Sequence, residues 1–587
     1  MFSNYEIRQV PLSLKSSRQK VVNFLAANDL RLEEVDYYAG VFAGDDDELL
    51  AGGGLSGDVL KCIAVSDALR DTGMSLSLVS HLLSVAQSNG HQQLKVFTKP
   101  ENKGIFENFS FHAIASAPKA ILMENGNGLR NYCSQLNALA GDKGEKRGVI
   151  VMNANPFTLG HRYLVEQAAA QVDTLFIIVV KEDRSLFSYA ERKAMIMAGV
   201  ADIANVVVCE GSDYAISAAT FPTYFLKQLS DATDTHITLD LDLFARHIAP
   251  ALGVTTRYVG SEPIDALTAR YNELMQEILP QHGIKVETIE RLVLNAKPVS
   301  ASLMRQALNE KSLTRAATLV PQTTEPYLIA HMASDALRDE LNTTPKPGLV
   351  DRNDNGAHKD MNLVLMNKSI DALHPFFVQL ALNGSICGEK YELPDAQVIR
   401  NIGIEAEKAM LNATCGVNTH RGALFAMGLT TMAASWCMAR DGIVGSKQLR
   451  ELIIQVAGQF TPTAGTHGNN AVNAHHVAGA LDLAKGGYSQ LFSAWLPAYR
   501  NYLADDASTA CHRLLLLIMS QLDDTNVIHR VGYDQAQQVK QEARTLLDHY
   551  STTGMEAMNR DYITRNISPG GSADMVALTL FIHSILN

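Results

Sequence analysis

A short histidine motif follows an apolar run near the middle of the chain. The segment Asn155-Pro156-Phe157-Thr158-Leu159-Gly160-His161 lies directly after the Val/Ile-rich run 148–152. Gly160 lets the backbone approach a phosphate, and a helix beginning here offers free N–H groups at its positive dipole end. His161 can donate a hydrogen bond to charge developing on an α-phosphate. A helix N-cap beside a packed histidine is the alternative, but the position after a parallel strand favours nucleotidyl transfer.

A second motif combines two hydroxyls with an arginine. In Ser300-Ala301-Ser302-Leu303-Met304-Arg305 the arginine follows Ser302 by three residues. The hydroxyls can cap a helix or bind phosphate oxygens, and Arg305 can clamp the outer phosphates of a nucleotide. Alone, this is a common N-cap pattern. Together with the histidine motif, it predicts a nucleotide site.

Four loops in the last 250 residues carry a third concentration of reactive side chains. They lie at 343–361, 413–422, 524–530 and 567–574, and each is rich in Gly, Asp, Asn, His or Arg beside an apolar helix pattern. Asp and Asn oxygens suit Mg²⁺, whereas Lys, Arg and Gly-rich backbone suit phosphates. One such loop would be a solvated connection. Four in one region predict a site for several phosphates and a metal ion.

The elements that must position the first two motifs are of mixed type. Residues 1–140 read as α/β, with strands expected at 59–65 and 93–98 around a helix at 74–87. The polar, Gly-rich stretch 141–147 predicts a boundary. Beyond it, a strand at 148–152, a helix at 161–170 and a strand at 174–180 form a βαβ unit. The alternation continues to about residue 320, which predicts a doubly wound parallel sheet over 146–325.

The loops of the third group lie among helices. Helix-period segments dominate after residue 325, so residues 335–587 are predicted to form one all-α domain. The expected helices are 325–341, 398–411, 423–439, 446–457, 470–484, 511–521, 533–549 and 572–586.

Composition excludes several classes of protein. The 587 residues are 47% hydrophobic and 19% charged, which is a globular balance, and 50 basic against 62 acidic side chains give a net charge of −12. Such a chain is a poor general binder of nucleic acid. Seven cysteines without a CxxC pair fit neither a disulfide framework nor a zinc ribbon. The N-terminus is unlike a signal peptide and apolar runs such as 514–519 are too short to span a membrane, so a cytoplasmic enzyme is expected.

The histidine and serine motifs together resemble the adenylyl-transferring nucleotidyltransferase superfamily, with its (H/T)xGH and ISxSxxR signatures. The segments 151–161, 180–192, 211–222 and 257–263 are similar to the citrate lyase ligase family, and this resemblance covers residues 1 to about 325. That family makes acetyl-adenylate from acetate and ATP, then acetylates the prosthetic-group thiol of the citrate lyase acyl-carrier subunit, releasing AMP and pyrophosphate. The resemblance implies ATP binding by Asn155, Thr158, Gly160, His161, Ser300, Ser302 and Arg305, with Thr158 and His161 catalytic and Lys181, Ser185 and Arg192 as weaker candidates.

Two departures from the ligase pattern are visible. Val299 replaces Ile conservatively, whereas Leu303 stands where the family often has Arg, which removes one phosphate contact. Residues 1–140 resemble an acetyltransferase-like (GNAT-like) domain, but Ser75 replaces the last Gly of its pyrophosphate loop. Acyl-CoA binding there stays open beside a structural role or docking of the carrier.

The four loops closely resemble triphosphoribosyl-dephospho-CoA synthase over about residues 335–587. That family attaches the ribose of ATP to 3′-dephospho-CoA and expels adenine. The resemblance implies that Asp351, Asp360 and Asp524 are catalytic, serving Mg²⁺ or the ribosyl cation, and that Lys346, His420 and Arg421 meet phosphates. The other residues matched to substrate binding are His358, Lys359, Asn418, Thr419, Asn526, Arg530, Ser568 and Asp574.

The synthase pattern also has departures. Cys415 replaces a Gly, Asn469 stands where Glu is usual, and Leu481 and Leu483 lie where a Gly-x-Arg-x-Glu-Ala pattern is expected. The main expectation is therefore a bifunctional enzyme that uses ATP with Mg²⁺. Two alternatives remain: an adenylyltransferase with another acceptor, and a ligase joined to an inactive, scaffold-like helical domain.

Overall fold

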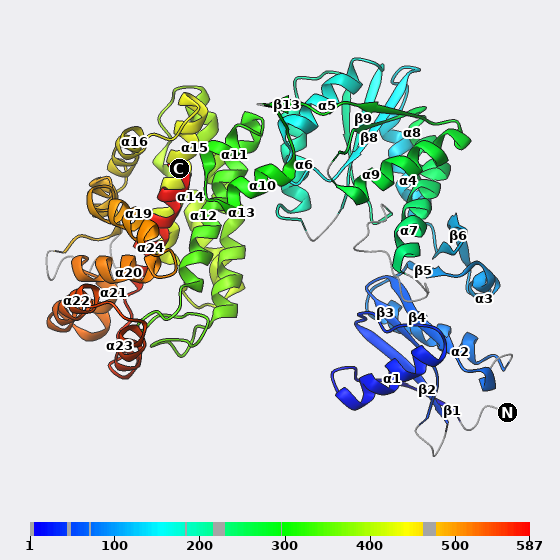
Figure 1. Cartoon of the computed structure of the whole chain (residues 1–587), viewed down its shortest axis with the longest axis horizontal. Helices are drawn as coiled ribbons and strands as arrows, with labels where there is room; N and C mark the ends of the chain where they lie inside the picture. The colour runs from blue at the N-terminus through cyan, green and yellow to red at the C-terminus, as the bar shows by residue number, and fades with distance from the viewer. Residues whose placement is uncertain are drawn as a thin grey trace. The chain divides into compact units, whose positions relative to one another are not determined.

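The computed structural model in Figure 1 describes residues 5–43, 48–69, 72–181, 185–214, 229–263, 265–294, 296–461 and 477–587. Contacts divide the chain into two compact units. The first holds Met1–Pro156 and Gly160–Pro298, and the second holds Phe157–Leu159 and Val299–Asn587. The first unit contains both large sheets, and the second is built from helices.

A seven-stranded mixed sheet forms the N-terminal part of the first unit. Its strands lie in the order β1-β2-β3-β4-β5-β7-β6, and all neighbours are antiparallel except β4 and β5. The bounds are β1 Tyr5–Gln9, β2 Tyr37–Ala43, β3 Leu49–Ser56, β4 Val59–Val65, β5 Leu94–Thr98, β6 Phe111–Ala117 and β7 Ala120–Asn125, with helices α1 Lys15–Ala27, α2 Met74–Ser88, α3 Lys103–Glu107 and α4 Gly128–Ala140.

A five-stranded parallel sheet forms the rest of the first unit. Its order is β10-β9-β8-β11-β12, so the parallel strands run outward on both sides from β8, the first of them in the chain. Every residue of β9 is buried, as its continuous apolar run predicts. The bounds are β8 Arg147–Met152, β9 Thr174–Val179, β10 Val206–Cys209, β11 Thr256–Gly260 and β12 Lys285–Ile289, with α5 Leu159–Ala169, α6 Tyr189–Gly199, α7 Leu229–Leu243, α8 Ala249–Leu252, α9 Ala266–Ile278 and the short pair β13 Val293–Leu294 and β14 Lys297–Pro298.

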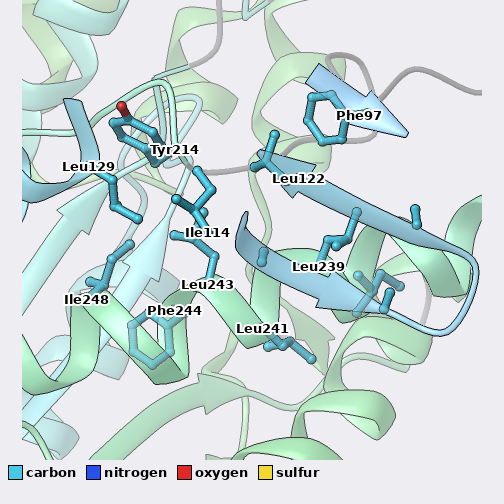
Figure 2. Close-up of a cluster of buried hydrophobic side chains, with 14 of the residues drawn as sticks. Phe97, Ile114, Leu122, Leu129, Tyr214, Leu239, Leu241, Leu243, Phe244 and Ile248 are labelled. Atoms are coloured by element: carbon cyan, nitrogen blue, oxygen red, sulfur yellow. The ribbon is translucent and has the colours of Figure 1, made fainter. Parts of the chain in front are cut away.

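The two sheet regions of the first unit share one hydrophobic core. Figure 2 shows Ile114 and Leu122, from β6 and β7, beside Leu239 and Leu243 of α7. The Ser116 N–H also donates to the Asp242 carboxylate at 2.8 Å, which links β6 to α7. The polar stretch 141–147 therefore connects two regions that are packed against each other.

Helices joined by loops make up the described part of the second unit after residue 299. Its helices are α10 Ala301–Asn309, α11 Leu313–Ala317, α12 Glu325–Asn342, α13 Leu363–Glu389, α14 Ala396–Ala413, α15 Arg421–Asp441, α16 Ser446–Gly458, α18 Ala480–Lys485, α19 Leu496–Asp505, α20 Ala510–Gln521, α21 Thr525–Val531, α22 Tyr533–Asp548, α23 Thr552–Thr564 and α24 Gly570–Ile585. Seven of the eight predicted helices match described ones closely. Most of the eighth, 470–484, lies outside the described residues, apart from the part in α18.

The longest helix, α13, was not predicted. It has 27 residues and contains Pro375, and apolar side chains occur around most of its circumference. Its buried residues form one stripe, but apolar residues such as Val364 and Ile386 stand on the exposed face and blur the sequence pattern. The internal Pro also argues locally against a helix, so both sequence signals fail here.

Among the described helices, only α15 is long and apolar enough to cross a membrane by length and composition. Within the folded unit 83% of its apolar window is buried. Because it packs against α13, α12 and α24, its apolar surface is accounted for by the core of the helical unit.

Candidate nucleotide-binding sites

Polar side chains tie together the loops that follow β8 and β9. The carboxyl ends of these neighbouring parallel strands form one edge of the sheet, where ligands bind in open α/β folds. The Asn155 side chain accepts a hydrogen bond from the Phe187 N–H at 3.1 Å, and the Asn153 amide donates to the Ser185 hydroxyl at 3.3 Å. Two of the predicted residues, Asn155 and Ser185, therefore hold the loops in place.

Arg192 is predicted to bind ATP, but its guanidinium points into the protein. The side chain is fully buried in α6. Its Nη1 donates to the Asn153 carbonyl at 2.8 Å and to the Val180 carbonyl at 2.9 Å, and its Nε donates to the Phe187 carbonyl at 3.1 Å. Lys181, by contrast, lies on the surface and pairs with Asp213 at 3.2 Å.

The histidine motif spans the start of α5 and belongs to both units. Thr158 is buried and lies in the second unit, whereas Gly160 and His161, in the first turn of α5, lie in the first. The Leu159 N–H donates to the Leu319 carbonyl at 2.9 Å. The hydroxyl of Thr324, the residue before α12, donates to the Phe157 carbonyl at 3.2 Å. The segment before His161 is thus anchored by the residues that precede α12.

The serine motif begins α10 in the second unit. The Ser300 hydroxyl accepts the Leu303 N–H at 3.2 Å, so in the structure it caps α10, while its predicted contact with ATP stays a prediction. Arg305 donates to the Ser302 hydroxyl at 3.1 Å, and burial lowers the pKa of its guanidinium. Ser302 and Arg305 thus form a local pair on the first turns of α10.

In the helical unit, the carboxylate of Asp524 joins the start of α21 to the start of α24. It caps α21 by accepting the Asn526 N–H at 2.9 Å. Its other oxygen accepts the N–H and the hydroxyl of Ser572, at 2.7 and 3.0 Å. Burial raises the pKa of Asp524, while these donors lower it. Two of the four predicted loops, 524–530 and 567–574, are therefore fixed to each other.

Glycines allow the N-terminal end of a third helix, α15, to lie close to the N-terminal ends of α21 and α24. A Cβ added at Gly422, in the first turn of α15, would lie 2.1 Å from the Asp574 carboxylate, and one at Gly570 would lie 2.8 Å from the Asn526 side chain. Desolvation, followed by the charges of Asp524 and Glu340, holds the pKa of the Asp574 carboxyl well above its usual value. The loop 413–422 thus joins the other two at the N-terminal ends of α15 and α24.

The loop 343–361 completes the cluster through His358. Its Nε2 lies 2.8 Å from the Ser568 hydroxyl, and its Nδ1 lies 3.1 Å from the Arg530 guanidinium. Arg530 also donates to the Ala357 carbonyl and to Asn566, and among the described residues no carboxylate forms an ion pair with it. A half-buried guanidinium beside a hydroxyl and a helix N-terminus is suited to an anion. Lys359 lies exposed next to His358, whereas Arg421 pairs with Glu407 at 3.1 Å.

Lys346 is predicted to meet phosphates, but it is buried in an ion pair. Its ammonium lies 2.5 Å from the Glu340 carboxylate, and both side chains are at most 7% exposed. Burial raises the pKa of Glu340, and Lys346 lowers it. Glu340 carries no signal of its own in the sequence, because it lies within the helical pattern of α12 and no neighbouring residue marks it as part of a site.

Removing the charge of Lys346 should strongly destabilise the helical unit. Lys346→Met leaves Glu340 buried without its partner, and we expect a loss of about 3–5 kcal/mol in the free energy of unfolding. Both tryptophans, Trp436 and Trp495, lie in this unit, so denaturant unfolding followed by tryptophan fluorescence reports on it alone. The double change Lys346→Met with Glu340→Gln should recover much of the loss. Equal losses in the single and double variants would contradict a coupled pair.

The three aspartates assigned to Mg²⁺ do not form a common metal site. Asp351 accepts the backbone N–H groups of Lys346 and Asn353 at 3.0 and 2.7 Å and thereby shapes its own loop. Asp524 is occupied by donors from α21 and α24, and the side chain of Asp360 is 61% exposed. Across the described ranges, no group of three or more His, Cys, Asp or Glu side chains is placed to hold a metal ion. The structure therefore does not bring the three aspartates together, and the part of any one of them in holding Mg²⁺ with substrate phosphates stays a prediction.

His420, predicted to meet phosphates, is buried at the N-cap of α15. Its Nδ1 lies 2.8 Å from the Ser369 hydroxyl, which in turn accepts from Thr419 at 2.6 Å. Its Nε2 has no hydrogen-bond partner among the described residues. Burial, with a smaller contribution from Lys346, lowers the pKa of His420 to about 4. Asn418, two residues earlier, is exposed.

The low pKa of His420 predicts acid sensitivity of the helical unit. An unfolded histidine titrates near 6.5, so its contribution to stability is fully present above that pH and is lost as the pH falls toward 4. For this group alone, we expect about 2 kcal/mol less stability at pH 5 than at pH 7.5. Tryptophan-monitored unfolding at both pH values should show this difference, and His420→Asn should reduce it. An unchanged difference in the variant would assign the acid sensitivity to other groups.

The residues that depart from the synthase pattern, Cys415, Leu481, Leu483 and Asn469, lie in different parts of the chain. Cys415 is exposed at φ 55°, in the left-handed region that a glycine adopts at lower cost. Leu481 and Leu483 lie half-buried in α18. Asn469 lies outside the described residues.

Comparisons with known proteins divide the chain at the start of α12. Residues 147–328 match the family model described as citrate lyase ligase C-terminal domain, and residues 326–587 match ATP:dephospho-CoA triphosphoribosyl transferase. The chain is 44% identical over 321 residues to the [citrate [pro-3S]-lyase] ligase of Klebsiella pneumoniae, covering 54% of this chain and 93% of the relative. The ligase of Escherichia coli K12 is 40% identical over 57% of this chain and 98% of its own.

The helical half has its own relatives. The probable 2-(5′′-triphosphoribosyl)-3′-dephosphocoenzyme-A synthase of Pectobacterium carotovorum is 37% identical over 268 residues, covering 43% of this chain and 88% of that protein. Among solved structures, the pantothenate synthetase of Thermus thermophilus is similar over 35% of this chain and 73% of its own, with 14% identity and a TM-score of 0.23.

Proposed function

We propose that this chain, which belongs to the citrate lyase ligase family in its N-terminal half and to the triphosphoribosyl-dephospho-CoA synthase family in its C-terminal half, is a bifunctional enzyme of citrate lyase activation. One half acetylates the prosthetic-group thiol of the citrate lyase acyl carrier. The other makes the precursor of that group from ATP and 3′-dephospho-CoA. ATP is the shared substrate.

One observation carries the synthase assignment. Four loops come together through Asp524 and Ser572, through His358 with Ser568 and Arg530, and through Gly422 beside Asp574, and His358 and Ser568 are 210 residues apart in the chain. The N-terminal ends of α15 and α24, with Arg530, favour the triphosphate of ATP. The carboxylate of Asp524 favours the positive charge that develops on the ribose as adenine leaves, by analogy with glycoside hydrolysis.

The bond changes in the synthase half balance without a further reactant. The bond between the ribose carbon and adenine breaks, and its electron pair leaves with the base. A hydroxyl oxygen of 3′-dephospho-CoA forms the new bond to that carbon, and its proton leaves to balance the charge on adenine. Holding the hydroxyl against the carbon supplies much of the acceleration. Since the aspartates fit no common metal site, no step is assigned to a protein-bound Mg²⁺.

The ligase half joins acetate to the α-phosphate of ATP and expels pyrophosphate. Negative charge grows on the α-phosphoryl oxygens, where His161 and the N-terminal end of α5 can offset it. The carrier thiol then attacks the acetyl carbon, and AMP leaves. The loops fixed by Asn155 and Ser185 form the floor of this site at the edge of the parallel sheet.

A product assay tests both halves in the same chain. With ATP, Mg²⁺ in the buffer and 3′-dephospho-CoA, the chain should release free adenine. With ATP, acetate and the holo acyl carrier, it should release AMP and acetylate the carrier. AMP formation without adenine would leave a ligase joined to an inactive helical domain. Nucleotidyl transfer that is independent of acetate and of the carrier would indicate an adenylyltransferase with another acceptor.

A further inference from the structure

The guanidinium of Arg192 lies beneath the two loops that bear the proposed adenylylation site. It comes from the first turn of α6 and is fully buried. Its hydrogen bonds reach Asn153, Val180 and Phe187, which lie on separate stretches of chain after β8 and β9. One planar group thus joins two strand ends and the start of α6.

The bonds of Arg192 set the position of each loop directly. The Asn153 side chain accepts from Nη1 at 2.7 Å and donates to Ser185, while the Asn153 carbonyl accepts from Nη1 at 2.8 Å. The Phe187 carbonyl accepts from Nε at 3.1 Å, and the Phe187 N–H donates to Asn155. These hydrogen bonds link the loop after β8 to the loop after β9 through the side chain of Arg192. A loop held on several sides can keep a bound nucleotide within the small tolerance that an in-line reaction needs.

Lysine cannot replace this arrangement. A guanidinium presents five donors in a fixed fork, whereas an ammonium is a compact charge with three donors. Lysine at 192 could satisfy one of the carbonyls after β8 and β9 but could not span both loops in the same geometry. The charge would remain and the bridge would be lost.

We infer that Arg192 is a positioning residue for the adenylyl-transfer step, acting through Asn153 and Phe187 and making no contact with ATP. This inference rests on the proposed ligase function. Its consequence is a particular kinetic pattern. Loss of the bridge should lower kcat much more than it raises the KM for ATP, because binding groups remain while their alignment is lost.

Arg147 provides a matched control within the same strand. It lies at the start of β8, at the opposite edge of the parallel sheet, and its guanidinium also donates to three main-chain carbonyls, those of Gly144, Leu252 and Gly141. Arg147→Lys therefore removes a similar set of bonds away from the strand ends where ligands bind. Any general effect of losing such bonds on folding should occur in both variants.

The test compares Arg192→Lys, Arg147→Lys and the unchanged chain in acetate-dependent AMP formation. We expect kcat to fall about 100-fold in Arg192→Lys with the KM for ATP within about threefold, and both constants to stay within about twofold in Arg147→Lys. Because Arg192 is buried and Arg147 is partly exposed, Arg192→Lys should lower the unfolding temperature more, so the kinetics are compared at a temperature at which both variants are folded. A large rise in KM at constant kcat would overturn the inference, because it would mean that Arg192 binds ATP. Equal kinetics in the two variants would overturn it as well.

A second measurement does not depend on activity. Hydrogen exchange of the amides at 153–155 and 185–188 should be faster in Arg192→Lys than in Arg147→Lys, with no ligand added. Unchanged exchange at both segments would remove the basis of the inference. If the unchanged chain forms no AMP from acetate, the proposed ligase function fails, and the exchange comparison alone decides whether Arg192 holds the loops.

Discussion

Replacing His161 with alanine should reduce acetate-dependent AMP formation about 100- to 1,000-fold, the loss measured when one preorganised donor to a developing oxyanion is removed. His161 lies in the first turn of α5, partly buried, at the carboxyl edge of β8. The imidazole contributes mainly in the transition state, so kcat should fall and the KM for ATP should change little. Steady-state AMP release at saturating carrier measures the effect.

The chain contains an internal control for the His161 variant. In the proposed assignment adenine release depends on residues of the second unit, such as Asp524 and Arg530, so it should be unchanged in His161→Ala. A parallel loss of both activities would indicate a folding defect. Full retention of AMP formation would show that the histidine motif is a structural N-cap and would remove the mechanistic argument for the ligase half.

Replacing Asp524 with alanine should have the largest effect in the helical half. The change leaves the N–H groups of Asn526 and Ser572 without their buried acceptor and removes the cap of α21. We expect a loss of about 3–5 kcal/mol of unfolding free energy and of nearly all adenine release. Adenine chromatography and tryptophan-monitored unfolding measure the two effects separately.

The neighbouring Asp523 gives a matched control for Asp524. It lies on the same loop but pairs with Lys540 at 2.8 Å, away from α24. Asp523→Ala should leave adenine release nearly unchanged and cost at most about 1 kcal/mol. Asp524→Asn keeps one acceptor and should fall between wild type and alanine in stability. If Asp524→Asn retained full adenine release, the negative charge of Asp524 would have no part in the reaction.

The local sequence pattern is sufficient to predict those strands and helices whose apolar residues recur with a clear period. The strand at 59–65 and the parallel order around β8 follow from apolar runs and alternation, and the capping role of Ser300 follows from its place before a helix pattern. The four loops of the helical half were also recognised from composition, and the structure brings them together. These signals are local, because each depends on residues within one element.

The residues whose surroundings differ from the sequence-based expectation are those that packing encloses. Arg192 reads as a surface cation in a polar motif, yet its partners lie as far as 39 residues away, and the ion pair of Lys346 with Glu340 depends on a tight loop after α12. His420 reads as a phosphate ligand, but burial between α13 and α15 makes it neutral. Charge and composition indicate which groups are reactive. Only packing determines whether they face a substrate or the protein itself.

The join between the two family matches lies inside a folded unit. The ligase match extends to residue 328, yet α10 and α11 belong to the same compact unit as the synthase helices, and α11 packs against α12 and α24. Almost every side chain of α12 from Pro326 to Leu337 is buried. If genes for the separate enzymes recombined at this point, the junction would therefore fall in a segment that packs in a hydrophobic core, and not in an exposed linker. A chimera that exchanges one half for that of another organism should need compensating substitutions around α12 before the Leu319 carbonyl and Thr324 can again anchor the segment that leads to His161.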